Sequence, residues 1–398
     1  MVQEVKRSLP MKNRFRDQFL LDPKIHFLNH GSFGACPRPV FETLIEWQQQ
    51  IERQPVEVLD RKIRSAMQTA RSALAVYLNC AAEDVVYFQN PTTAVNMVMR
   101  SLSLNHGDEI LSTNHEYGAM DRTWRFYAKN MGVRYINHPM EIPVTSHQAF
   151  IDTFWQGVNE RTRVIFLSHI TSQTALIFPV TEICRMAREA GILTIIDGAH
   201  APGQVPVDLT AIKPDLYTGA CHKWMCVPKG SAFLYADQEV QQWLEPLVVS
   251  WGYQAEQPSD SRYIDYHEWQ GTRDMSAFLS VPAAIDYQRC NDWEQVRTDC
   301  HAMLIETRNR LHQLTGLPKI CPDGTEWLGQ MAAVPLPEMD LSHLMTRLYQ
   351  EYRIEVPVYR WFGRPFLRVS IQAYNTPKDL EALEEAMAAL LPQEFDRR

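Results

Sequence analysis

Residues 164–200 read VIFLSHITSQTALIFPVTEICRMAREAGILTIIDGAH, and this stretch decides the expected fold. Two short apolar runs, 164–167 and 192–196, flank a segment whose apolar residues recur at helical spacing over 180–190 and which ends at Gly191. Apolar strands that alternate with helices indicate a sheet that is buried on both faces and paired mainly in parallel. The stretch therefore predicts an α/β architecture.

The same alternation occurs earlier in the chain, where the runs 85–88 and 109–112 each precede a helical segment. The pattern changes after about residue 275. We expect a large domain over 26–275, and a small α+β domain formed by 1–25 together with 276–398. In the C-terminal part we expect helices over 276–303, 305–314, 342–353 and 378–391, and strands over 327–334 and 366–371.

The composition excludes several classes of protein. The chain has 398 residues, of which 45% are hydrophobic and 22% charged, so it is neither disordered nor a coiled coil. Its formal net charge of −8, spread without long blocks, gives no footprint for nucleic acid or for an anionic membrane surface. No apolar run approaches the roughly 20 residues of a membrane-spanning helix. These observations indicate a soluble protein, and most such proteins of this size are enzymes.

The cysteines and the N-terminus bear on location. The eight cysteines are scattered and form no CxxC pair, which is typical of reduced thiols rather than of a disulfide framework. The first 19 residues are charged and lack the apolar core of a secretory signal. We therefore expect a cytoplasmic protein.

Polar residues follow the predicted strands at the points where the strands end. In open α/β sheets ligands bind at the carboxyl ends of the strands, so we expect these residues to form one site. The groups are Asn90 to Thr93, His115 to Tyr117, Ser168 to Ser172, Asp197 with His200, and His222 with Lys223.

Asp197 and Lys223 determine which chemistry this site favours. Asp197 ends an apolar run, so its carboxylate is expected to be partly desolvated and to require a partner. Asp197 could also cap the next helix, or bind a metal together with His200 and the other strand-end histidines. Lys223 stands among aromatic and apolar neighbours, which favour a neutral, nucleophilic amine.

Pyridoxal phosphate matches this inventory of side chains. It needs an amine for a Schiff base, a carboxylate at its pyridine nitrogen, a stacking ring, a donor to its phenolate oxygen and an anion site. Thr92 and Thr93, at the start of a predicted helix, could supply the anion site or could simply cap that helix. The chain contains neither a Walker A loop nor a GxGxxG fingerprint, which argues against nucleotide and NAD binding.

Six segments together resemble the class V aminotransferase family, whose members are pyridoxal phosphate-dependent enzymes of fold type I. The LNHGSFGA opening, the HEYGA segment and the RVSIQAYN ending are most similar to the isopenicillin N epimerase-like branch. The resemblance implies a mainly parallel, seven-stranded sheet in the large domain, and a homodimer with shared active sites. The segments are 28–35, 90–96, 197–200, 221–224, 271–274 and 367–370.

The resemblance also implies roles around the cofactor ring. Lys223 would carry the cofactor as a Schiff base and move the Cα proton, and Asp197 would keep the pyridine nitrogen protonated. Tyr117 would stack on the ring. His200 would lie near the phenolate oxygen, where cysteine desulfurases have Gln, and Ser172 falls where they have Asn. Lys223, Tyr117 and His200 are therefore the expected catalytic residues.

The phosphate of the cofactor has four implied contacts. Thr92, Thr93 and His222 would bind it from the same chain. Thr272 matches a residue that reaches the phosphate from the neighbouring subunit.

The substrate is expected to be a small molecule, an amino acid or an amino-acid-like side chain. Arg368 matches the arginine that grips the α-carboxylate in a forked pair, a task that lysine performs less well. Asn29 and Ser32 would border the same substrate.

The position of the cysteines narrows the reaction. Desulfurases of this family need a cysteine shortly before the carboxylate-binding arginine, but the last cysteine here is Cys321, so persulfide transfer is disfavoured. Chemistry through a Cα carbanion remains, and we expect an epimerase or racemase. A second acid or base would face Lys223, and Tyr117 or a histidine could serve. The alternatives in the same family are a C–S lyase or desulfhydrase and an aminotransferase. Outside it they are a metal-dependent hydrolase that uses the strand-end Asp and His, and, less favoured, a non-catalytic binding protein.

Overall fold

The computed structural model describes residues 14–391, so the parts of the predicted small domain at 1–13 and 392–398 lie outside the described residues. The larger part of the molecule is built on a seven-stranded sheet with the order β2-β8-β7-β6-β5-β3-β4. β8 runs in the opposite direction to the other six strands, which all run parallel to one another. The strands are β2 (Val85–Phe88), β3 (Glu109–Thr113), β4 (Arg134–His138), β5 (Thr162–Ser168), β6 (Leu193–Asp197), β7 (Leu216–Ala220) and β8 (Ala232–Ala236). The predicted α/β class with a mainly parallel, seven-stranded sheet is confirmed.

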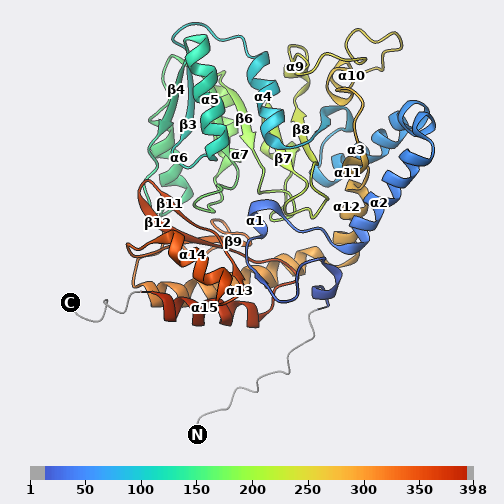
Figure 1. The fold of residues 1–398 in the computed structure, drawn as a ribbon. Helices are drawn as coiled ribbons and strands as arrows, with labels where there is room; N and C mark the ends of the chain where they lie inside the picture. Colours follow the sequence, from blue (N-terminus) through green and yellow to red (C-terminus); the bar gives the residue numbers. More distant parts are fainter. Residues whose placement is uncertain (1–13, 392–398) are drawn as a thin grey trace.

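Apolar side chains leave both faces of this sheet. Val86 and Phe166 belong to one buried cluster, whereas Tyr87 and Ile165, one position away, belong to the other. Because side chains alternate between faces along a strand, two covered faces require strands that are apolar throughout. α4 and α5 cover one face, whereas α3, α6, α7 and α8 cover the other (Figure 1). These helices are α3 (Ile63–Leu78), α4 (Pro91–Ser101), α5 (Gly118–Met131), α6 (His147–Trp155), α7 (Val180–Glu189) and α8 (Leu209–Ile212).

A smaller layer lies at one end of the large sheet (Figure 1). Its antiparallel sheet has the order β11-β12-β9. Phe15 and Phe19 pack edge-on against Trp293 and Tyr374, so the N-terminal residues accompany this layer. β1 (His26–Phe27) pairs with β10 (Ile354–Glu355). The exact domain boundary stays a prediction. The other elements of this layer are β9 (Met331–Pro335), β11 (Val358–Trp361), β12 (Arg364–Ser370), α13 (Trp293–Thr315), α14 (Leu341–Gln350) and α15 (Pro377–Leu390).

The helices after residue 275 differ from the expected ones. The expected long helix over 276–303 is divided into α11 (Ser276–Leu279), α12 (Val281–Cys290) and the start of α13, and the expected break near residue 304 lies inside α13. The true break is at Asp292, which adopts a left-handed φ of 51° and whose side chain accepts a hydrogen bond from the Gln295 amide. Asp tolerates this conformation and caps helices, so it starts α13.

The expected strand over 327–334 also begins later, at Met331. The backbone N–H groups of Trp327 and Leu328 both donate to the carbonyl of Gly324, at 3.0 and 3.1 Å. These residues therefore form a turn, and the apolar run is packed in the core without being a strand.

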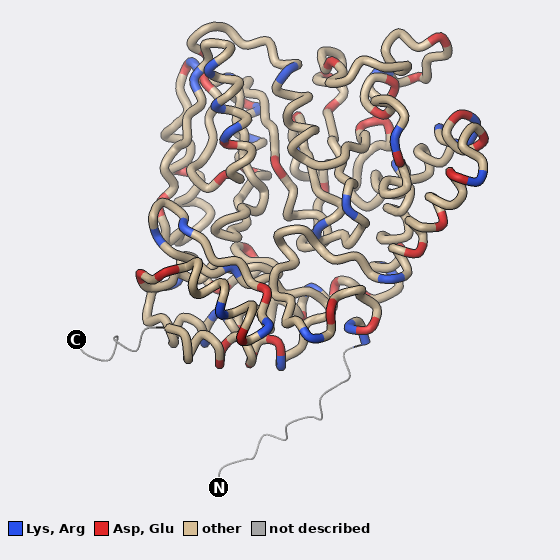
Figure 2. Tube along the Cα trace, viewed as in Figure 1, with Lys and Arg blue, Asp and Glu red and all other residues tan. Residues whose placement is uncertain are grey.

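The remaining helices connect or flank the two parts. α1 lies where the parts meet, and α2 packs with α11 and α12 (Figure 1). They are α1 (His30–Phe33), α2 (Arg38–Arg53), α9 (Gln238–Gln241) and α10 (Arg262–Glu268). Lys and Arg alternate with Asp and Glu over the whole described trace (Figure 2). None of the helices within 14–391 combines the length and the apolar character needed to cross a bilayer.

A buried ion pair connects α3 to α10. The Arg71 guanidinium contacts both carboxylate oxygens of Glu268, and the two side chains are 8% and 13% exposed. Burial raises the pKa of Glu268, and Arg71 acts against that rise. Arg273 also donates to the Glu268 carbonyl at 2.9 Å, so the pair anchors the loop that carries Thr272.

We predict that Arg71→Met lowers the free energy of unfolding by roughly 3 kcal/mol, because it leaves the Glu268 carboxylate buried without a cation. Urea denaturation of the wild type and the variant measures the change. The matched control is the double variant Arg71→Met, Glu268→Leu, which removes both charges and should lose less stability than the single variant. Equal losses in the single and double variants would contradict the proposed role of the pair.

Candidate active site

The ends of three neighbouring strands lie side by side at the junction of the two parts. Ser168 of β5, Asp197 of β6 and Thr218 of β7 are register partners across the sheet. The small layer closes over this edge, because Arg368 of β12 donates to Ser172, which follows β5. Two of the predicted polar groups, those that begin at Ser168 and at Asp197, therefore lie side by side at this edge.

Lys223 lies on a tight turn between β7 and β8 that other backbone segments hold closely. Gly34 has a φ of +70°, and a Cβ at this position would lie 2.1 Å from the His222 carbonyl oxygen. Only glycine satisfies both the conformation and the approach. Burial lowers the pKa of Lys223 to about 8; the Asp197 carboxylate opposes this shift and Arg368 adds to it. The neutral amine is therefore far more accessible near physiological pH than in an exposed lysine.

His200 bridges Lys223 and Trp224. Its Nε2 lies 3.0 Å from the Lys223 Nζ, and its Nδ1 accepts a hydrogen bond from the Trp224 indole at 3.2 Å. Burial, assisted by the nearby Lys223, lowers the pKa of His200 well below its usual value. The imidazole is therefore neutral and contacts the amine directly.

Asp197 supplies a buried carboxylate at the bottom of the site. It is 4% exposed, and its Oδ1 accepts a hydrogen bond from the Ala199 amide at 2.9 Å. Burial raises its pKa, while this hydrogen bond and the Lys223 charge act in the opposite direction. In the described part of the chain its other oxygen receives no hydrogen bond, so it is available to a cationic ligand group.

Glu116 is a second buried carboxyl group, to which the sequence analysis assigns no role. Its Oε2 accepts from the Ser168 amide at 3.0 Å and from the Ser168 hydroxyl at 2.5 Å. Burial raises the pKa of Glu116 to about 8, and the charge of Asp197 adds to the rise. Hydrogen bonds from Ser168 and Thr113 act against this rise, and Glu116 and Asp197 are two buried carboxyl groups at one edge of the sheet. In the sequence, the position of Glu116 shortly after the apolar run of β3 was the signal that could have identified it.

Arg368 is a buried cation without an anionic partner among the described residues. It is 6% exposed; Nη1 donates to the Ser172 carbonyl and hydroxyl at 2.5 and 3.2 Å, and Nη2 to the Ser32 hydroxyl at 3.0 Å. Its Nε has no hydrogen-bond partner in the described chain. Burial lowers the pKa of this guanidinium. A buried, uncompensated charge is costly, so this arrangement suits a carboxylate ligand.

Asn29 and Ser32 extend this polar cluster from α1. The Ser32 hydroxyl donates to the Asn29 Oδ1 at 2.5 Å, and the Asn29 amide nitrogen donates to Glu355 at 3.1 Å. The structure thus brings both residues, and Ser172, to Arg368. Tyr117 lies near enough to act on the pKa of Arg368, and its ring is 47% exposed.

The start of α4 leaves Thr92 free to bind an anion. The Asn90 side chain accepts hydrogen bonds from the Thr93 amide and hydroxyl, at 2.8 and 3.1 Å, so Thr93 is already engaged by the helix cap. Within 14–391 the Thr92 amide and hydroxyl have no hydrogen-bond partner. Because helix N-termini carry free N–H groups and a partial positive charge, Thr92 is the better placed of the two predicted phosphate ligands.

His222 and Thr272 have less direct support as phosphate ligands. The His222 Nδ1 lies 2.9 Å from the Ser231 carbonyl, so that nitrogen carries the proton. Burial lowers the pKa of His222 to about 4, which leaves only a lone pair on Nε2. Thr272 is exposed on the loop after α10, and no hydrogen bond joins it to the other predicted site residues of its own chain.

The other strand-end histidines have partners of their own. His115 contacts the Thr174 hydroxyl at 2.7 Å and the Met140 carbonyl at 2.9 Å, and His169 contacts the Tyr217 hydroxyl at 2.9 Å. Within residues 14–391 no three His, Cys, Asp or Glu side chains are grouped as a metal centre requires. The geometry therefore does not favour the metal-dependent alternative.

The residues that do converge fit pyridoxal phosphate. Lys223 offers a partly neutral amine, Asp197 an available buried carboxylate, and His200 a ring nitrogen that contacts the amine. Thr92, which no hydrogen bond in the described chain joins to these residues, offers unengaged donors at the start of α4. The orphaned Arg368 Nε offers a further donor for an anionic substrate. This donor set matches the chemistry that the cofactor requires.

Comparisons with known proteins agree with this assignment. The family model described as aminotransferase class-V matches residues 35–383. Isopenicillin N epimerase from Amycolatopsis lactamdurans is 37% identical, over 94% of this chain and 97% of that protein. The Streptomyces clavuligerus enzyme of the same name is 32% identical with the same coverage. Putative L-cysteine desulfhydrase 1 of Oryza sativa subsp. japonica is 29% identical, over 92% of this chain and 83% of that protein.

Solved structures support the fold. The apo cysteine desulfurase from Thermococcus onnurineus has a TM-score of 0.83 at 17% identity, and the comparison covers 96% of this chain and 99% of the other. The cystine C–S lyase C-DES in complex with cysteine persulfide has a TM-score of 0.80 at 18% identity, with coverage of 92% and 98%. The match of the family model over most of the chain shows that this protein belongs to the class V aminotransferase family, as its motifs predict.

Proposed function

We propose that this protein is a pyridoxal phosphate-dependent epimerase that inverts the configuration at the Cα of an amino acid or an amino-acid-like side chain. One structural observation carries the proposal. The unpaired, buried guanidinium of Arg368 lies close enough to the buried Lys223 amine for its charge to lower the pKa of that amine, so a carboxylate and the adjacent Cα can be presented to one base. The two epimerases at 37% and 32% identity support epimerisation as the reaction.

Each residue has a defined task in this proposal. When bound, the cofactor withdraws electrons from the substrate Cα and so acidifies its proton. Asp197 would hold a proton at the pyridine nitrogen, Arg368 would bind the α-carboxylate, and the Lys223 amine would remove the Cα proton from one face. Tyr117 would cover the ring of the cofactor and, as the second acid, would deliver a proton to the opposite face of Cα, which completes the inversion. His200 keeps a hydrogen-bond contact with Lys223.

A sulfur-accepting reaction lacks its acceptor in this chain. Cys321, the last cysteine, is buried, and its Sγ accepts a hydrogen bond from Arg308 at 3.4 Å. Burial also raises the pKa of this thiol to about 11, so it is not a ready nucleophile. Elimination of sulfide, which needs no acceptor, is the second candidate. It is favoured by the rice relative named as a putative L-cysteine desulfhydrase.

Incubation in deuterated water distinguishes these reactions. With isopenicillin N as substrate we expect deuterium at the inverted Cα and no keto acid. With L-cysteine we expect no sulfide or pyruvate. Release of sulfide and pyruvate would overturn the epimerase proposal in favour of a lyase, and accumulation of a keto acid would favour an aminotransferase.

The control for this experiment is Lys223→Ala. This variant removes the amine that is the proposed base. It should still fold and therefore retain the far-ultraviolet circular dichroism of the wild type. Exchange should fall by at least about 1,000-fold, consistent with the loss of a general base and covalent anchor.

Replacement of Arg368 tests carboxylate binding. We predict that Arg368→Lys lowers kcat/KM by about 100-fold, because lysine cannot form the forked pair of hydrogen bonds. Steady-state kinetics on the substrate measures the change. Arg364→Lys, an exposed arginine on the same strand, is the matched control and should leave kcat/KM unaltered. Similar losses in both variants would contradict a specific role for Arg368.

We further propose that two copies of the chain form a homodimer with shared active sites. Val249 and Trp251, 67% and 80% exposed, lie with Tyr253 on the segment between β8 and α10. Adjacent exposed aromatic and aliphatic side chains are typical of a protein interface. Thr272 is exposed on the loop after α10, which is consistent with a contact to the partner's cofactor phosphate.

Mixing two inactive variants tests this arrangement. Lys223→Ala lacks the base, and Thr272→Arg should block the partner's phosphate site. In a mixed dimer one site contains both an intact Lys223 and an intact Thr272. Random re-association should therefore restore about a quarter of the wild-type activity. No recovery from dimers shown by sedimentation to be mixed, or a monomeric wild type, would contradict the proposal.

A cytoplasmic location stays a prediction. All eight cysteines of the described residues are free thiols, which supports a reducing compartment. Fractionation of the native cells is the direct measurement.

A further inference from the structure

We propose that Trp224 is a positioning residue that fixes the tautomer of His200 and thereby holds the Lys223 amine in its neutral form. The inference deepens the proposed function, on which its catalytic meaning rests. It concerns two consecutive contacts, one from an indole to an imidazole and one from that imidazole to an amine. Both are hydrogen bonds, and their proton positions depend on each other.

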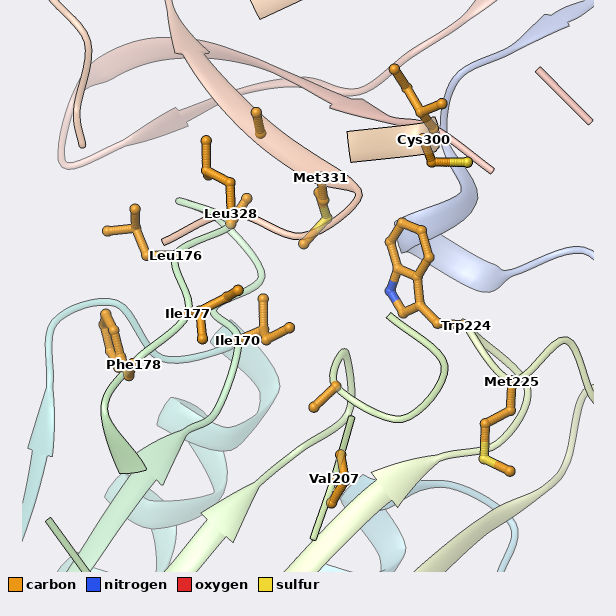
Figure 3. Packing of buried hydrophobic residues seen from close by; sticks show 14 of the residues in the cluster. Ile170, Leu176, Ile177, Phe178, Val207, Trp224, Met225, Cys300, Leu328 and Met331 are labelled. Carbon is orange, nitrogen blue, oxygen red and sulfur yellow. The ribbon is translucent and has the colours of Figure 1, made fainter. Parts of the chain in front are cut away.

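The first contact determines where His200 carries its proton. Trp224 is fully buried, on the turn that also carries Met225 (Figure 3). Its indole nitrogen lies 3.2 Å from the His200 Nδ1. An indole N–H can only donate, so Nδ1 must accept and carries no proton. The single proton of the neutral imidazole is then on Nε2.

The second contact transmits this choice to Lys223. The His200 Nε2 is 3.0 Å from the Lys223 Nζ, and an Nε2–H group must donate along that line. The amine accepts only if it has a lone pair, and an ammonium group has none. Both hydrogen bonds therefore exist together only when Lys223 is neutral.

Without the indole donor the opposite arrangement becomes accessible. The imidazole could place its proton on Nδ1 and accept from a Lys223 ammonium through Nε2. With Trp224 present, that tautomer directs the indole N–H and the Nδ1–H at one another in a buried space. Trp224 thus disfavours the ammonium form, although the two residues exchange no direct hydrogen bond.

The surrounding charges act on these two groups in known directions. Burial disfavours a protonated His200, and Arg368, together with Lys223 when it is charged, His222 and His30, adds to this effect, so the imidazolium does not compete with the two neutral tautomers. Around Lys223, the Asp197 carboxylate favours the ammonium form, and burial together with Arg368 disfavours it. These opposing effects bring the pKa of Lys223 to about 8, so the tautomer of His200 can change the protonation of the amine near physiological pH.

The surrounding contacts prevent Trp224 and His200 from moving apart. The His30 ring packs against the indole with centroids 4.8 Å apart. Gln204 donates to the His200 carbonyl at 2.8 Å. Gly203 has a φ of +90°, and a Cβ there would lie 2.2 Å from the Trp224 carbonyl oxygen. These contacts hold both Trp224 and His200 in place.

The first test reads the tautomer without the cofactor. In apo-protein labelled with ¹⁵N-histidine, we expect the His200 signals of the Nε2–H form in the wild type. In Trp224→Phe, which keeps an aromatic ring against His30, we expect a mixture of tautomers. The matched control is Trp124→Phe, because the Trp124 indole is equally buried but has no hydrogen-bond partner in the described chain. An unaltered Nε2–H signal in Trp224→Phe would overturn the proposal.

The second test reads the pKa of Lys223. The rate at which apo-protein captures pyridoxal 5′-phosphate should rise with pH and level off above about 8 in the wild type, because only the neutral amine reacts. In Trp224→Phe the same curve should move upward by about one pH unit, the effect expected of one buried hydrogen bond. At neutral pH the variant should then react about 10-fold more slowly, with the same plateau.

A double-variant cycle separates this route from a general packing effect. In a His200→Leu background the tautomer no longer exists, so adding Trp224→Phe should leave the capture curve in place. An equal shift in both backgrounds would overturn the proposal. Capture by apo-protein and the histidine signals do not depend on the reaction catalysed. A failure of the epimerase proposal in deuterated water is therefore distinguishable from a failure of this inference.

Discussion

The contact between the Lys223 backbone and the segment before α2 is the constraint on which the rest of the site depends. His30 approaches the Lys223 carbonyl to 3.1 Å with its Nε2, and Tyr374 of the small layer lies 3.0 Å from the Nδ1 of the same ring. Gly34 lies against the Lys223 Cα, where any Cβ would collide. Both parts of the molecule therefore meet at one residue, and the amine is fixed relative to Arg368 on β12.

Part of this site could be predicted from the sequence because its residues follow apolar strands. Asp197 ends β6 and Lys223 follows β7, so their types and order already indicated a carboxylate and an amine at one sheet edge. The seven-stranded, mainly parallel sheet followed from the family resemblance and is confirmed. The role of Arg368 also came from the resemblance, since nothing in a strand pattern shows that a guanidinium will be buried without an anion.

Other features depend on contacts that a linear pattern does not contain. Thr92 keeps its donors free whereas Thr93 does not, because the Asn90 side chain accepts hydrogen bonds from the Thr93 amide and hydroxyl. The raised pKa of Glu116 follows from its burial, to which the charge of Asp197 adds. The helix start at Asp292 was available in the sequence as a capping residue, but the apolar spacing on either side of it concealed the break. In the sequence, Trp224 could be recognised only as an apolar neighbour of Lys223. Its role as a hydrogen-bond donor becomes visible only with the position of His200.

The local charges explain how an acidic protein can bind an anionic cofactor and an anionic substrate. The formal net charge of −8 is the sum of charges of both signs that are scattered along the described trace (Figure 2). At physiological salt such charges are screened beyond about 8 Å, so they contribute little inside the site. There the groups that count are the buried guanidinium of Arg368, the Thr92 donors at a helix start and the Asp197 carboxylate. The lowered pKa of Lys223 completes this set, because the neutral form of the amine acts as a nucleophile while Arg368 provides the positive charge that a substrate carboxylate needs.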